Sequence, residues 1–527
     1  MQKKLSRSNI GQIQRALGSV KDVALFYKLN LPILLLIALV SVIAYANGLG
    51  GQFLSADDIP GIVRNQALRD FPTTAKTFNL TLTFASAVTN IFGVKPFPFH
   101  LTILFVHILN SYLVLLLAYQ LLGKRVALYS SLLFAVLPSG SEAVFWISGM
   151  GYIFQTFLSL VCINLFVIFS KTGRLGFLLA SLSVYLMALV VMQTPWLFTV
   201  PVILVLLDTL IVDGAIRFKI LIRKCWRYGA FFVLDLIYWV IFMSGRFSSR
   251  VTSLTTEFYF NPAESASWSA RLPYSVYKTL ELYFVPLRLS FFHEEALTTP
   301  VYAVMVLVTL LAVVIAGLLV LKKRYVYAGL MFSIIASIAP TFSPVQVAWF
   351  VAERYLYFGG VFFAMVLALL IIRVDYIKNV RNLGGIILSV IVILYSFRLI
   401  TRANDFKDSK ALWIATQKTA PLSYRVYNNL GDVYSNEQNW DLAVWSFKQS
   451  VALEPGYADA VHNLGYTYML MGDYENAKKY LLESYQKNPR LYQALVKLGD
   501  IEYKLGNTER AKEYYNQALS INPNATQ

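Results

Sequence analysis

Charged residues are scarce in this chain. They make up 14% of its 527 residues, whereas soluble proteins carry about 25%, and 57% of the residues are hydrophobic. This composition excludes a protein that is soluble throughout. Cysteine is scarcer still, because Cys162 and Cys225 are the only two. They cannot form the disulfide framework of a small secreted domain.

Several motifs of well-known enzyme classes are also absent. The sequence has no glycine-rich phosphate loop ending in Lys-Ser/Thr, no Cys/His cluster with zinc spacing and no Gly-x-Ser-x-Gly turn. Ionisable residues within apolar runs, which transporters place near the membrane midplane, are limited to Asp208 and Asp235, and neither is paired in sequence. A transporter is therefore poorly supported.

Long hydrophobic runs, in contrast, recur through the first 400 residues. About 20 apolar residues cross a bilayer as a helix, so we predict eleven spans, of which the third and the ninth are short. They cover residues 30–48, 98–122, 126–141, 148–169, 175–193, 196–212, 228–244, 301–321, 325–340, 355–372 and 383–400. Residues 1–29 are basic and amphipathic and lack a small-residue cleavage site, which predicts a cytosolic segment before an uncleaved anchor.

The net charge of +17 lies entirely in this apolar part, because residues 401–527 contain 14 basic and 14 acidic residues. With a cytosolic N-terminus, the inner loops hold 21 basic residues against Asp22, Asp213 and Asp375, while the outer face is nearly neutral. The excess therefore predicts the orientation of the chain in a membrane. We expect this membrane to be a prokaryotic plasma membrane rather than the endoplasmic reticulum. We expect no nucleic-acid partner, and we expect residues after 400 to be extracytoplasmic.

A repeat of 34 residues begins after position 420. The repeated positions are Gly431, Gly465, Gly499; Ala443, Ala477, Ala511; and Pro455, Pro489, Pro523. This pattern strongly resembles the tetratricopeptide repeat (TPR), with units at 424–457, 458–491 and 492–525. Small residues let the two helices of a unit approach closely, and proline ends the second helix. The third unit departs from the others in having Glu502 where they have tyrosine.

Two long outer loops, 49–97 and 245–300, are the places where we expect chemistry. The first contains Asp57 and Asp58, and the second ends in His293, Glu294 and Glu295 after an aromatic amphipathic stretch, 272–292, interpreted as a re-entrant or interfacial helix. Adjacent carboxylates raise one another's pKa, which suits a general base, and they point about 100° apart on a helix, so the two aspartates should have different roles.

Four motifs occur in an order that is informative as a set. Asp57-Asp58-Ile-Pro-Gly-Ile-Val-Arg-Asn follows the first span, and Phe99-His100-Leu-Thr-Ile-Leu-Phe-Val-His107 opens the second. Pro138-Ser-Gly-Ser-Glu142-Ala-Val-Phe-Trp-Ile-Ser-Gly joins the third and fourth, and Ala352-Glu353-Arg354-Tyr-Leu-Tyr lies near the tenth. With the repeats, these motifs resemble the transmembrane-and-TPR O-mannosyltransferases and their prokaryotic relatives, in the GT-C superfamily of polyprenyl-phosphate-sugar glycosyltransferases.

This resemblance implies transfer of a sugar, possibly mannose, from a polyprenyl-phosphate donor to a protein acceptor on the outer face. Asp57 or Asp58 would be the base, with its neighbour positioning the acceptor or a metal, and Arg354 would bind the donor phosphate. Glu142 would line the sugar pocket or support the acceptor. Metal dependence stays open, since two adjacent aspartates do not decide it.

The other candidate residues have competing structural interpretations. His100 could contact the substrate, whereas His107, deeper in the span, suits an interhelical hydrogen bond. Glu353 suits an ion pair with a cation nearby. His293 and Glu294 could join the substrate pocket, but a metal there would need a third ligand that the sequence does not locate.

The sequence thus predicts an all-α polytopic membrane protein with an extracytoplasmic TPR solenoid. Its expected parts are the cytosolic segment 1–29, a GT-C-like domain at 30–400, a linker or helix at 401–423 and repeats at 424–525. The TPR module would bind an acceptor or partner protein, and the membrane domain would contact lipid. Two alternatives stay open: a non-catalytic membrane scaffold that presents the repeats, and a polysaccharide ligase or polymerase.

Overall fold

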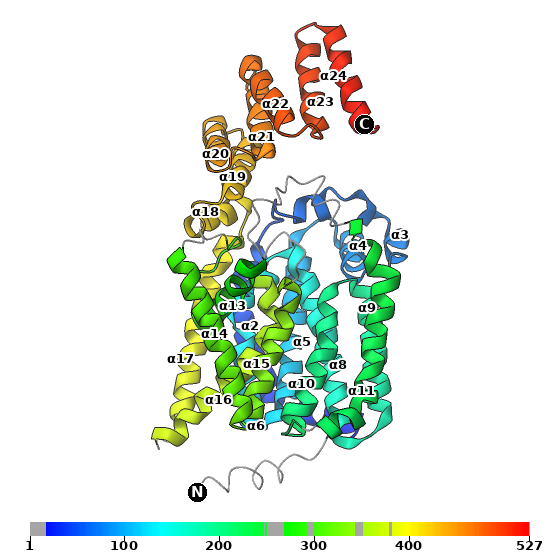
Figure 1. Ribbon diagram of the computed structural model, residues 1–527, viewed down its shortest axis with the longest axis vertical. Coiled ribbons are helices and arrows are strands. Elements are labelled where there is room, and N and C mark those ends of the chain that lie inside the picture. Colours follow the sequence, from blue (N-terminus) through cyan, green and yellow to red (C-terminus); the bar gives the residue numbers. More distant parts are fainter. Residues whose placement is uncertain are drawn as a thin grey trace. The chain divides into compact units, whose positions relative to one another are not determined.

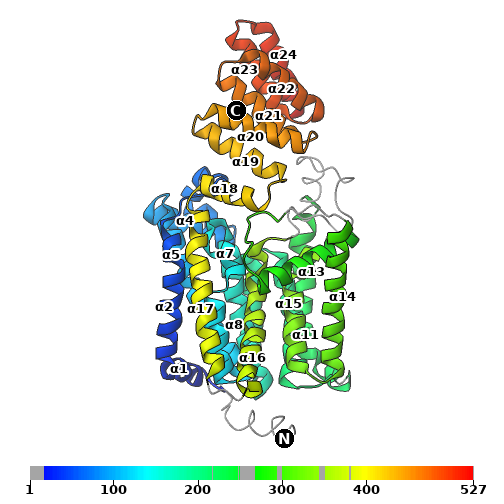
Figure 2. The same cartoon turned by 90° about the vertical axis from the view of Figure 1, so that its left-hand side faces the viewer.

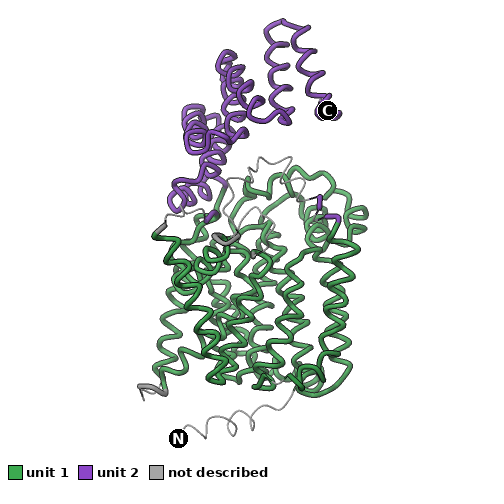
Figure 3. Tube along the Cα trace, viewed as in Figure 1, with its two compact units in different colours: residues 1–244, 267–291, 297–408 green, residues 245–266, 292–296, 409–527 purple. Residues whose placement is uncertain are grey.

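A computed structural model describes residues 17–216, 218–246, 248–249, 268–293, 299–342, 351–378 and 382–525. Within these ranges every regular element is a helix (Figure 1). The chain divides into two compact units (Figure 3). Unit 1 comprises Met1–Ser244, Ser267–Phe291 and Leu297–Asp408, and unit 2 comprises Gly245–Ala266, Phe292–Ala296 and Ser409–Gln527.

Unit 1 is a bundle of long apolar helices. Nine helices in the described part of the chain are long and apolar enough to cross a membrane. They are Leu31–Gly50, Pro96–Leu122, Ile147–Thr172, Leu175–Met192, Pro195–Val212, Phe218–Arg246, Pro300–Leu321, Glu353–Asp375 and Leu383–Phe406. A helix rises about 1.5 Å per residue, so each of them approaches or exceeds the apolar thickness of a bilayer.

The remaining two predicted spans are helices of a different kind. The predicted span 126–141 is a bent pair, Lys124–Ala135 and Pro138–Phe145, whose halves meet at 50°. Pro138 explains the break, because proline has no backbone N–H and clashes with the preceding helical turn. The predicted span 325–340 is the shorter apolar helix Tyr325–Thr341. Within the described ranges, the number of crossing helices by length and composition is therefore nine, or ten if the bent pair crosses once.

The principal helices of unit 1 lie side by side in Figures 1 and 2. Helix α5 packs against α6 and α8, and α16 packs against α6 and α15. Their bounds are α1 Val20–Leu29, α2 Leu31–Tyr45, α5 Pro96–Leu122, α6 Lys124–Ala135, α8 Met150–Thr172, α9 Leu175–Met192, α10 Thr199–Leu206, α11 Phe218–Tyr238, α14 Thr299–Leu321, α15 Tyr325–Ile338, α16 Leu356–Lys378 and α17 Leu383–Arg402.

Several short helices lie at one end of this bundle. Figure 1 shows α3, α4 and α13 toward this end, and Figure 2 shows α4 and α13 there and α1 at the opposite end. The short elements are η1 Ala46–Gly50, η2 Ile59–Val63, η3 Gln66–Arg69, α3 Phe71–Ala75, α4 Leu80–Phe92, η4 Pro138–Gly140, α7 Ser141–Phe145, η5 Ile147–Gly149, η6 Pro195–Phe198, η7 Leu207–Val212, η8 Trp239–Met243, α13 Trp268–Phe284, η9 Ala339–Phe342, η10 Glu353–Tyr355 and η11 Ala403–Phe406.

Two contacts between loops agree with the prediction, made from the basic residues, that successive loops lie on alternate sides of the membrane. Arg174 donates to the backbone carbonyl of Gly18, and Arg125 forms an ion pair with Asp375. All four residues belong to segments predicted on the side of the N-terminus. Each of these contacts therefore joins segments that were predicted to lie on one side.

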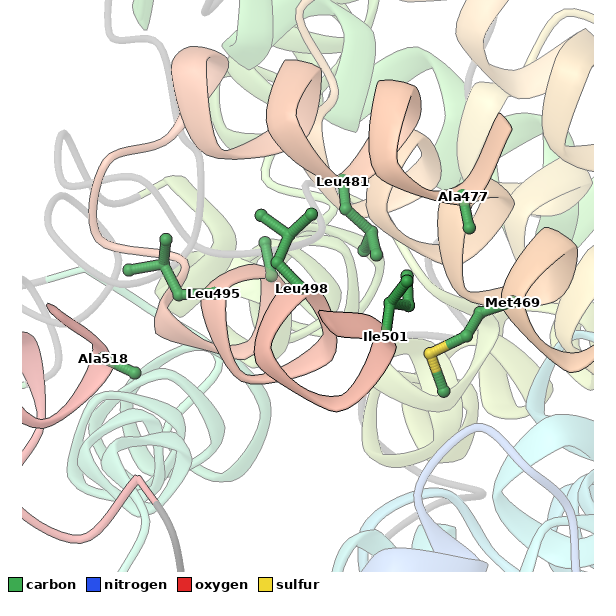
Figure 4. Close-up of a cluster of buried hydrophobic side chains, with 8 residues drawn as sticks. Met469, Ala477, Leu481, Leu495, Leu498, Ile501 and Ala518 are labelled. Carbon is green, nitrogen blue, oxygen red and sulfur yellow. The ribbon is translucent and has the colours of Figure 1, made fainter. Parts of the chain in front are cut away.

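Unit 2 contains helix α18, Ser409–Thr419, and three antiparallel helix pairs. The pairs are α19 Tyr424–Asn436 with α20 Trp440–Leu453, α21 Ala458–Leu470 with α22 Tyr474–Lys487, and α23 Tyr492–Lys504 with α24 Thr508–Ile521. Figure 4 shows the apolar core between the second and third pairs, formed by Met469, Ala477, Leu481, Leu495, Leu498, Ile501 and Ala518.

The repeated glycines allow close packing within each pair. A Cβ added to Gly431 would lie 2.5 Å from the ring of Phe447, and one added to Gly499 would lie 2.6 Å from the ring of Tyr515. At Gly465 the same atom would lie 3.0 Å from the backbone nitrogen of Leu481. The close helix approach expected from the sequence is confirmed. Glu502, the exception in the third unit, is buried and forms an ion pair of 2.6 Å with Lys478.

Candidate active site at one end of the helix bundle

The two adjacent aspartates have opposite environments. Asp58 is completely buried, whereas Asp57 is exposed. One carboxylate oxygen of Asp58 accepts the backbone N–H of Leu54 at 3.0 Å, and the other accepts the backbone N–H of Ser148 at 2.9 Å and its hydroxyl at 2.5 Å. Burial raises the pKa of Asp58 to about 6, although these hydrogen bonds favour its ionised form. Asp58 thus anchors the segment that follows α2, and Asp57 beside it is exposed.

A tight turn brings Ser148 to Asp58. The turn is η5, which follows directly on α7, and the backbone N–H of Trp146 donates to the carbonyl of Glu142 at 3.0 Å. A Cβ on Gly149 would lie 3.0 Å from the Cα of Ala143 and 3.1 Å from its carbonyl oxygen. A side chain at position 149 would press against the backbone of Ala143, so this close approach favours the glycine that follows Ser148 in the motif.

Glu142 and Arg354 form a buried ion pair. Glu142 is completely buried and Arg354 is 6% exposed. One oxygen of Glu142 accepts from the guanidinium of Arg354, and the other accepts the backbone N–H of Arg354 at 3.0 Å. The carboxylate thereby fixes both the side chain of Arg354 and the turn that carries it. The pair joins α7 to η10, segments separated by 212 residues in the sequence.

Aromatic rings surround the guanidinium of Arg354. Its central carbon lies 5.0 Å from the ring centroid of Tyr355, 5.1 Å from that of Trp146 and 5.8 Å from that of Phe291. The ring of Tyr355 in turn lies 4.9 Å from that of Trp196. Cation–π contacts stabilise a guanidinium that is shielded from water.

Glu353 pairs with an arginine that is remote in the sequence. Its oxygens accept from Arg402 at 3.2 and 3.3 Å, and one also accepts the backbone N–H of Ser290 at 2.5 Å. Arg402 also donates to the carbonyl of Leu289 at 3.2 Å and to Asp405 at 2.9 Å. The adjacent residues Glu353 and Arg354 thus connect η10 to two different parts of unit 1.

The two histidines of α5 have different surroundings. His100 is buried, and its Nε2 has no hydrogen-bond partner among the residues that the structure describes. The backbone of Gly51 lies beside it, because a Cβ on Gly51 would be 3.2 Å from that nitrogen. His107 bonds Tyr357 in α16 at 2.7 Å and the carbonyl of Ala135 in α6 at 3.1 Å. The interhelical hydrogen bond predicted for His107 is confirmed.

Of the three candidate residues in loop 245–300, one lies within the described residues. His293 is partly buried and belongs to unit 2, and Glu294 and Glu295 lie outside the described residues. Across the described residues, no group of three or more His, Cys, Asp or Glu side chains could hold a metal ion.

The structure brings most of the candidate residues together through the segment that carries α7 and η5. Glu142 in this segment holds Arg354, Trp146 packs on Arg354, and Ser148 holds Asp58. Sequence reasoning had not assigned roles to Trp146, Ser148 or Arg402. Trp146 and Ser148 stand in the motif that begins at Pro138, and this motif was the available signal. Arg402 ends an apolar run and gave no signal of its own.

Comparisons with known proteins identify the repeats directly. The tetratricopeptide repeat family model matches residues 424–457, 458–489 and 492–525. The chain is also similar to Protein O-mannosyl-transferase TMTC3, with 27% identity to the Homo sapiens protein and 25% to the Mus musculus protein. Each match covers 122 residues, 23% of this chain and 13% of the relative, so the match spans only a small part of these relatives.

Two solved structures are similar at low identity. A crystal structure of MamA matches with 19% identity and a TM-score of 0.21, covering 30% of this chain and 86% of MamA. The crystal structure of ArnT from Cupriavidus metallidurans bound to undecaprenyl phosphate matches with 12% identity and a TM-score of 0.43, covering 88% of this chain and 81% of ArnT.

Proposed function

We propose that this protein is a membrane glycosyltransferase that moves a sugar, with mannose as the first candidate, from a polyprenyl-phosphate donor to a protein acceptor. The observation that carries the proposal is the cluster of Asp58, Glu142, Arg354, Glu353 and Arg402, all buried at one end of an apolar helix bundle beside the exposed Asp57. Buried charges cost free energy, and active sites are where proteins arrange them. The resemblance of the four ordered motifs supplies the reaction class.

We assign Asp57 as the base and Asp58 as its positioning neighbour. Asp57 is exposed and can reach an acceptor, whereas Asp58 is buried and accepts three hydrogen bonds that hold the outer segment. In the reaction, the acceptor oxygen bonds to the anomeric carbon and its proton passes to Asp57. The bond between that carbon and the phosphate oxygen breaks, and its electron pair leaves with the lipid phosphate. No strong general acid is needed, because phosphate already departs as a stable anion.

Arg354 is the proposed phosphate ligand. A guanidinium has five N–H donors, so it can remain paired with Glu142 and still donate to a phosphate oxygen. Glu142 and Glu353 each neutralise an arginine, and we assign them the role of positioning the site. His100, whose Nε2 has no hydrogen-bond partner among the described residues, is a further candidate to contact a sugar hydroxyl.

The sidedness of the protein follows from its basic loops in this proposal. The N-terminus would be cytosolic, and the site and the TPR module would face the extracytoplasmic side, where the repeats would bind the acceptor or a partner protein. The segment 1–29, the membrane domain 30–400, the linker 401–423 and the repeats 424–525 are the proposed working parts.

The decisive experiment is complementation of a deletion strain with Asp57→Asn, Asp58→Asn and the double variant, read by glycoproteomics. Removing a general base costs about 10² to 10⁴ in rate, so Asp57→Asn should abolish detectable transfer without lowering the melting temperature. Asp70→Asn is the matched control. Asp70 caps α3 by accepting the N–H of Thr73 at 3.1 Å, and asparagine can accept the same hydrogen bond, so this control removes an exposed carboxylate at only a small cost in stability.

Each outcome separates the proposal from its alternatives. If both the glycopeptides and the exported polysaccharide are unchanged in the double variant, at normal protein level, the enzyme is excluded and the TPR scaffold remains. Loss of an exported polysaccharide with glycopeptides intact would instead indicate a polysaccharide ligase or polymerase.

A further inference from the structure

Trp146 is a buried tryptophan whose polar edge is unused. It is 4% exposed, and its Nε1 has no hydrogen-bond partner among the described residues. Its ring packs on Arg354 and lies edge-to-face with Phe291 at 5.2 Å. Buried tryptophans normally find a partner for this N–H, and leaving it unpaired carries a free-energy cost.

The direction of this donor is fixed by the surrounding packing. A buried hydroxyl can rotate toward a neighbouring carbonyl, but an indole N–H points where its ring points. The ring of Trp146 is held between Arg354, which lies over its face, and Phe291, which packs against it in a T-shaped arrangement. Its backbone is fixed by the hydrogen bond to Glu142. The unpaired N–H is therefore preorganised, which favours binding an acceptor oxygen from outside the chain.

The position of Trp146 indicates which ligand oxygen would accept its N–H. It lies between Ser148, which holds Asp58, and Glu142, which holds Arg354. The guanidinium occupies the ring face, so this face cannot stack on a sugar. Because Glu142 already neutralises Arg354, a neutral donor beside it adds a hydrogen bond to an anion without adding charge. Phosphate oxygens accept several donors at once.

We propose that Trp146 donates its indole N–H to a phosphate oxygen of the lipid-linked donor, beside Arg354. This assignment rests on the proposed function and adds a specificity-determining residue to it. It makes Trp146 a ligand contact and not only a packing residue.

The test compares wild-type protein with Trp146→Phe, both full-length and purified in nanodiscs. Two probes are used: undecaprenyl phosphate, and the same lipid phosphate carrying the sugar. Phenylalanine keeps the ring on Arg354 and removes the N–H. Losing a hydrogen bond to a charged group should weaken binding of both probes by the same factor, about tenfold or more. Trp226→Phe is the control, because Trp226 is exposed and packs on Phe169 in α8.

A second substitution guards against misfolding of the phenylalanine variant. Benzothienylalanine at position 146 keeps the fused ring and replaces the N–H with sulfur, and it should weaken both probes equally. Unchanged affinity for both probes would overturn the inference, and weaker binding of the sugar-carrying probe alone would overturn the phosphate assignment. If wild-type protein bound neither probe, the proposed function itself would fail.

Discussion

At the scale of single residues, buried charge is compensated across long stretches of sequence. Glu142 and Arg354 are neighbours in space, and so are Glu353 and Arg402, yet neither pair is close along the chain. Removing one member of a buried pair costs far more than replacing both, because the remaining charge stays in a medium of low dielectric constant. The pairs therefore hold η10 in place as much as they prepare a site.

Glu142→Gln should destabilise the protein by about 3–5 kcal/mol, because it leaves the charge of Arg354 buried without a partner. Thermal unfolding in nanodiscs measures the loss as a lower melting temperature. The double variant Glu142→Gln/Arg354→Met should recover part of it. A single variant that melts like wild type would show that the pair contributes no stability.

Asp432 in the first repeat gives a prediction about pH. Burial, with a contribution from Asp459, raises its pKa to about 7. Unfolded aspartate has a pKa near 4, so between about pH 4 and pH 7 the folded chain retains a proton that the unfolded chain releases. Stability of the repeats therefore falls as pH rises through this window.

Asp432→Asn should remove this penalty and raise the melting temperature of the repeats at pH 8 more than at pH 5. Asp473 provides the contrast, because hydrogen bonding to Asn476 lowers its pKa. Asp473→Asn should therefore reduce stability at pH 8 and have less effect at pH 3. Equal shifts at both pH values for Asp432→Asn would contradict the assignment.

The interhelical hydrogen bond of His107 was predictable from its depth in a span. Helical geometry likewise predicted that the adjacent aspartates point apart, and their different roles stay a prediction. Their partners were not predictable. Ser148 reaches Asp58 from 90 residues away, and Arg402 reaches Glu353 from 49 residues away. Such contacts depend on how the bundle closes, which no local pattern encodes.

At the scale of elements, the two helices of each TPR unit meet at a turn that recurs every 34 residues. Gly472 and Gly506 occupy this turn with φ of 83° and 82°, whereas the equivalent residue of the first unit is Gln438 with φ of 58°. Left-handed backbone suits glycine and strains residues with a Cβ. The first unit therefore contains a strained turn that its neighbours avoid.

Gln438→Gly should relieve this strain and stabilise the repeats by about 0.5–1 kcal/mol, whereas Gly472→Ala should destabilise them by about 1–2 kcal/mol. Both changes are read by thermal unfolding of the full chain. Gly456→Ala, whose nearest contact is the flexible Glu454 side chain, serves as the neutral comparison. Opposite signs for the first two variants are the expected signature, and a destabilising Gln438→Gly would refute it.

The bent helix pair Lys124–Ala135 and Pro138–Phe145 contains a break that was not predicted from the sequence. Hydrophobicity predicted one short span at 126–141, but Pro138 interrupts the helix and Gly149 permits the close turn that follows. Hydropathy averages over such breaks. The residues that break the helix are the ones that carry Glu142, Trp146 and Ser148 to the candidate site.

At the scale of the whole molecule, the uneven charge predicts an orientation that native cysteines can test. Cys225 is exposed and Cys162 is buried, so wild-type protein has one accessible thiol among its two cysteines. Cys225 lies in a basic segment predicted to be cytosolic. A membrane-impermeant maleimide should label it only after the cells are permeabilised.

A Ser520→Cys substitution in a Cys225→Ser background tests the side on which the repeats lie. Ser520 is exposed in α24, so its replacement should be labelled in intact cells if the repeats are extracytoplasmic. Cys225→Ser alone should remain unlabelled. Labelling of native Cys225 in intact cells would reverse the orientation and move the candidate site to the cytosol.

The separation of Glu142 from Arg354 by 212 residues has a consequence for biosynthesis. A ribosome adds about 5–20 residues per second, so Arg354 is made roughly 10 to 40 s after Glu142. During that interval the carboxylate waits in a nascent membrane protein without its counter-charge. A chain that stops before Arg354 never supplies this partner for Glu142.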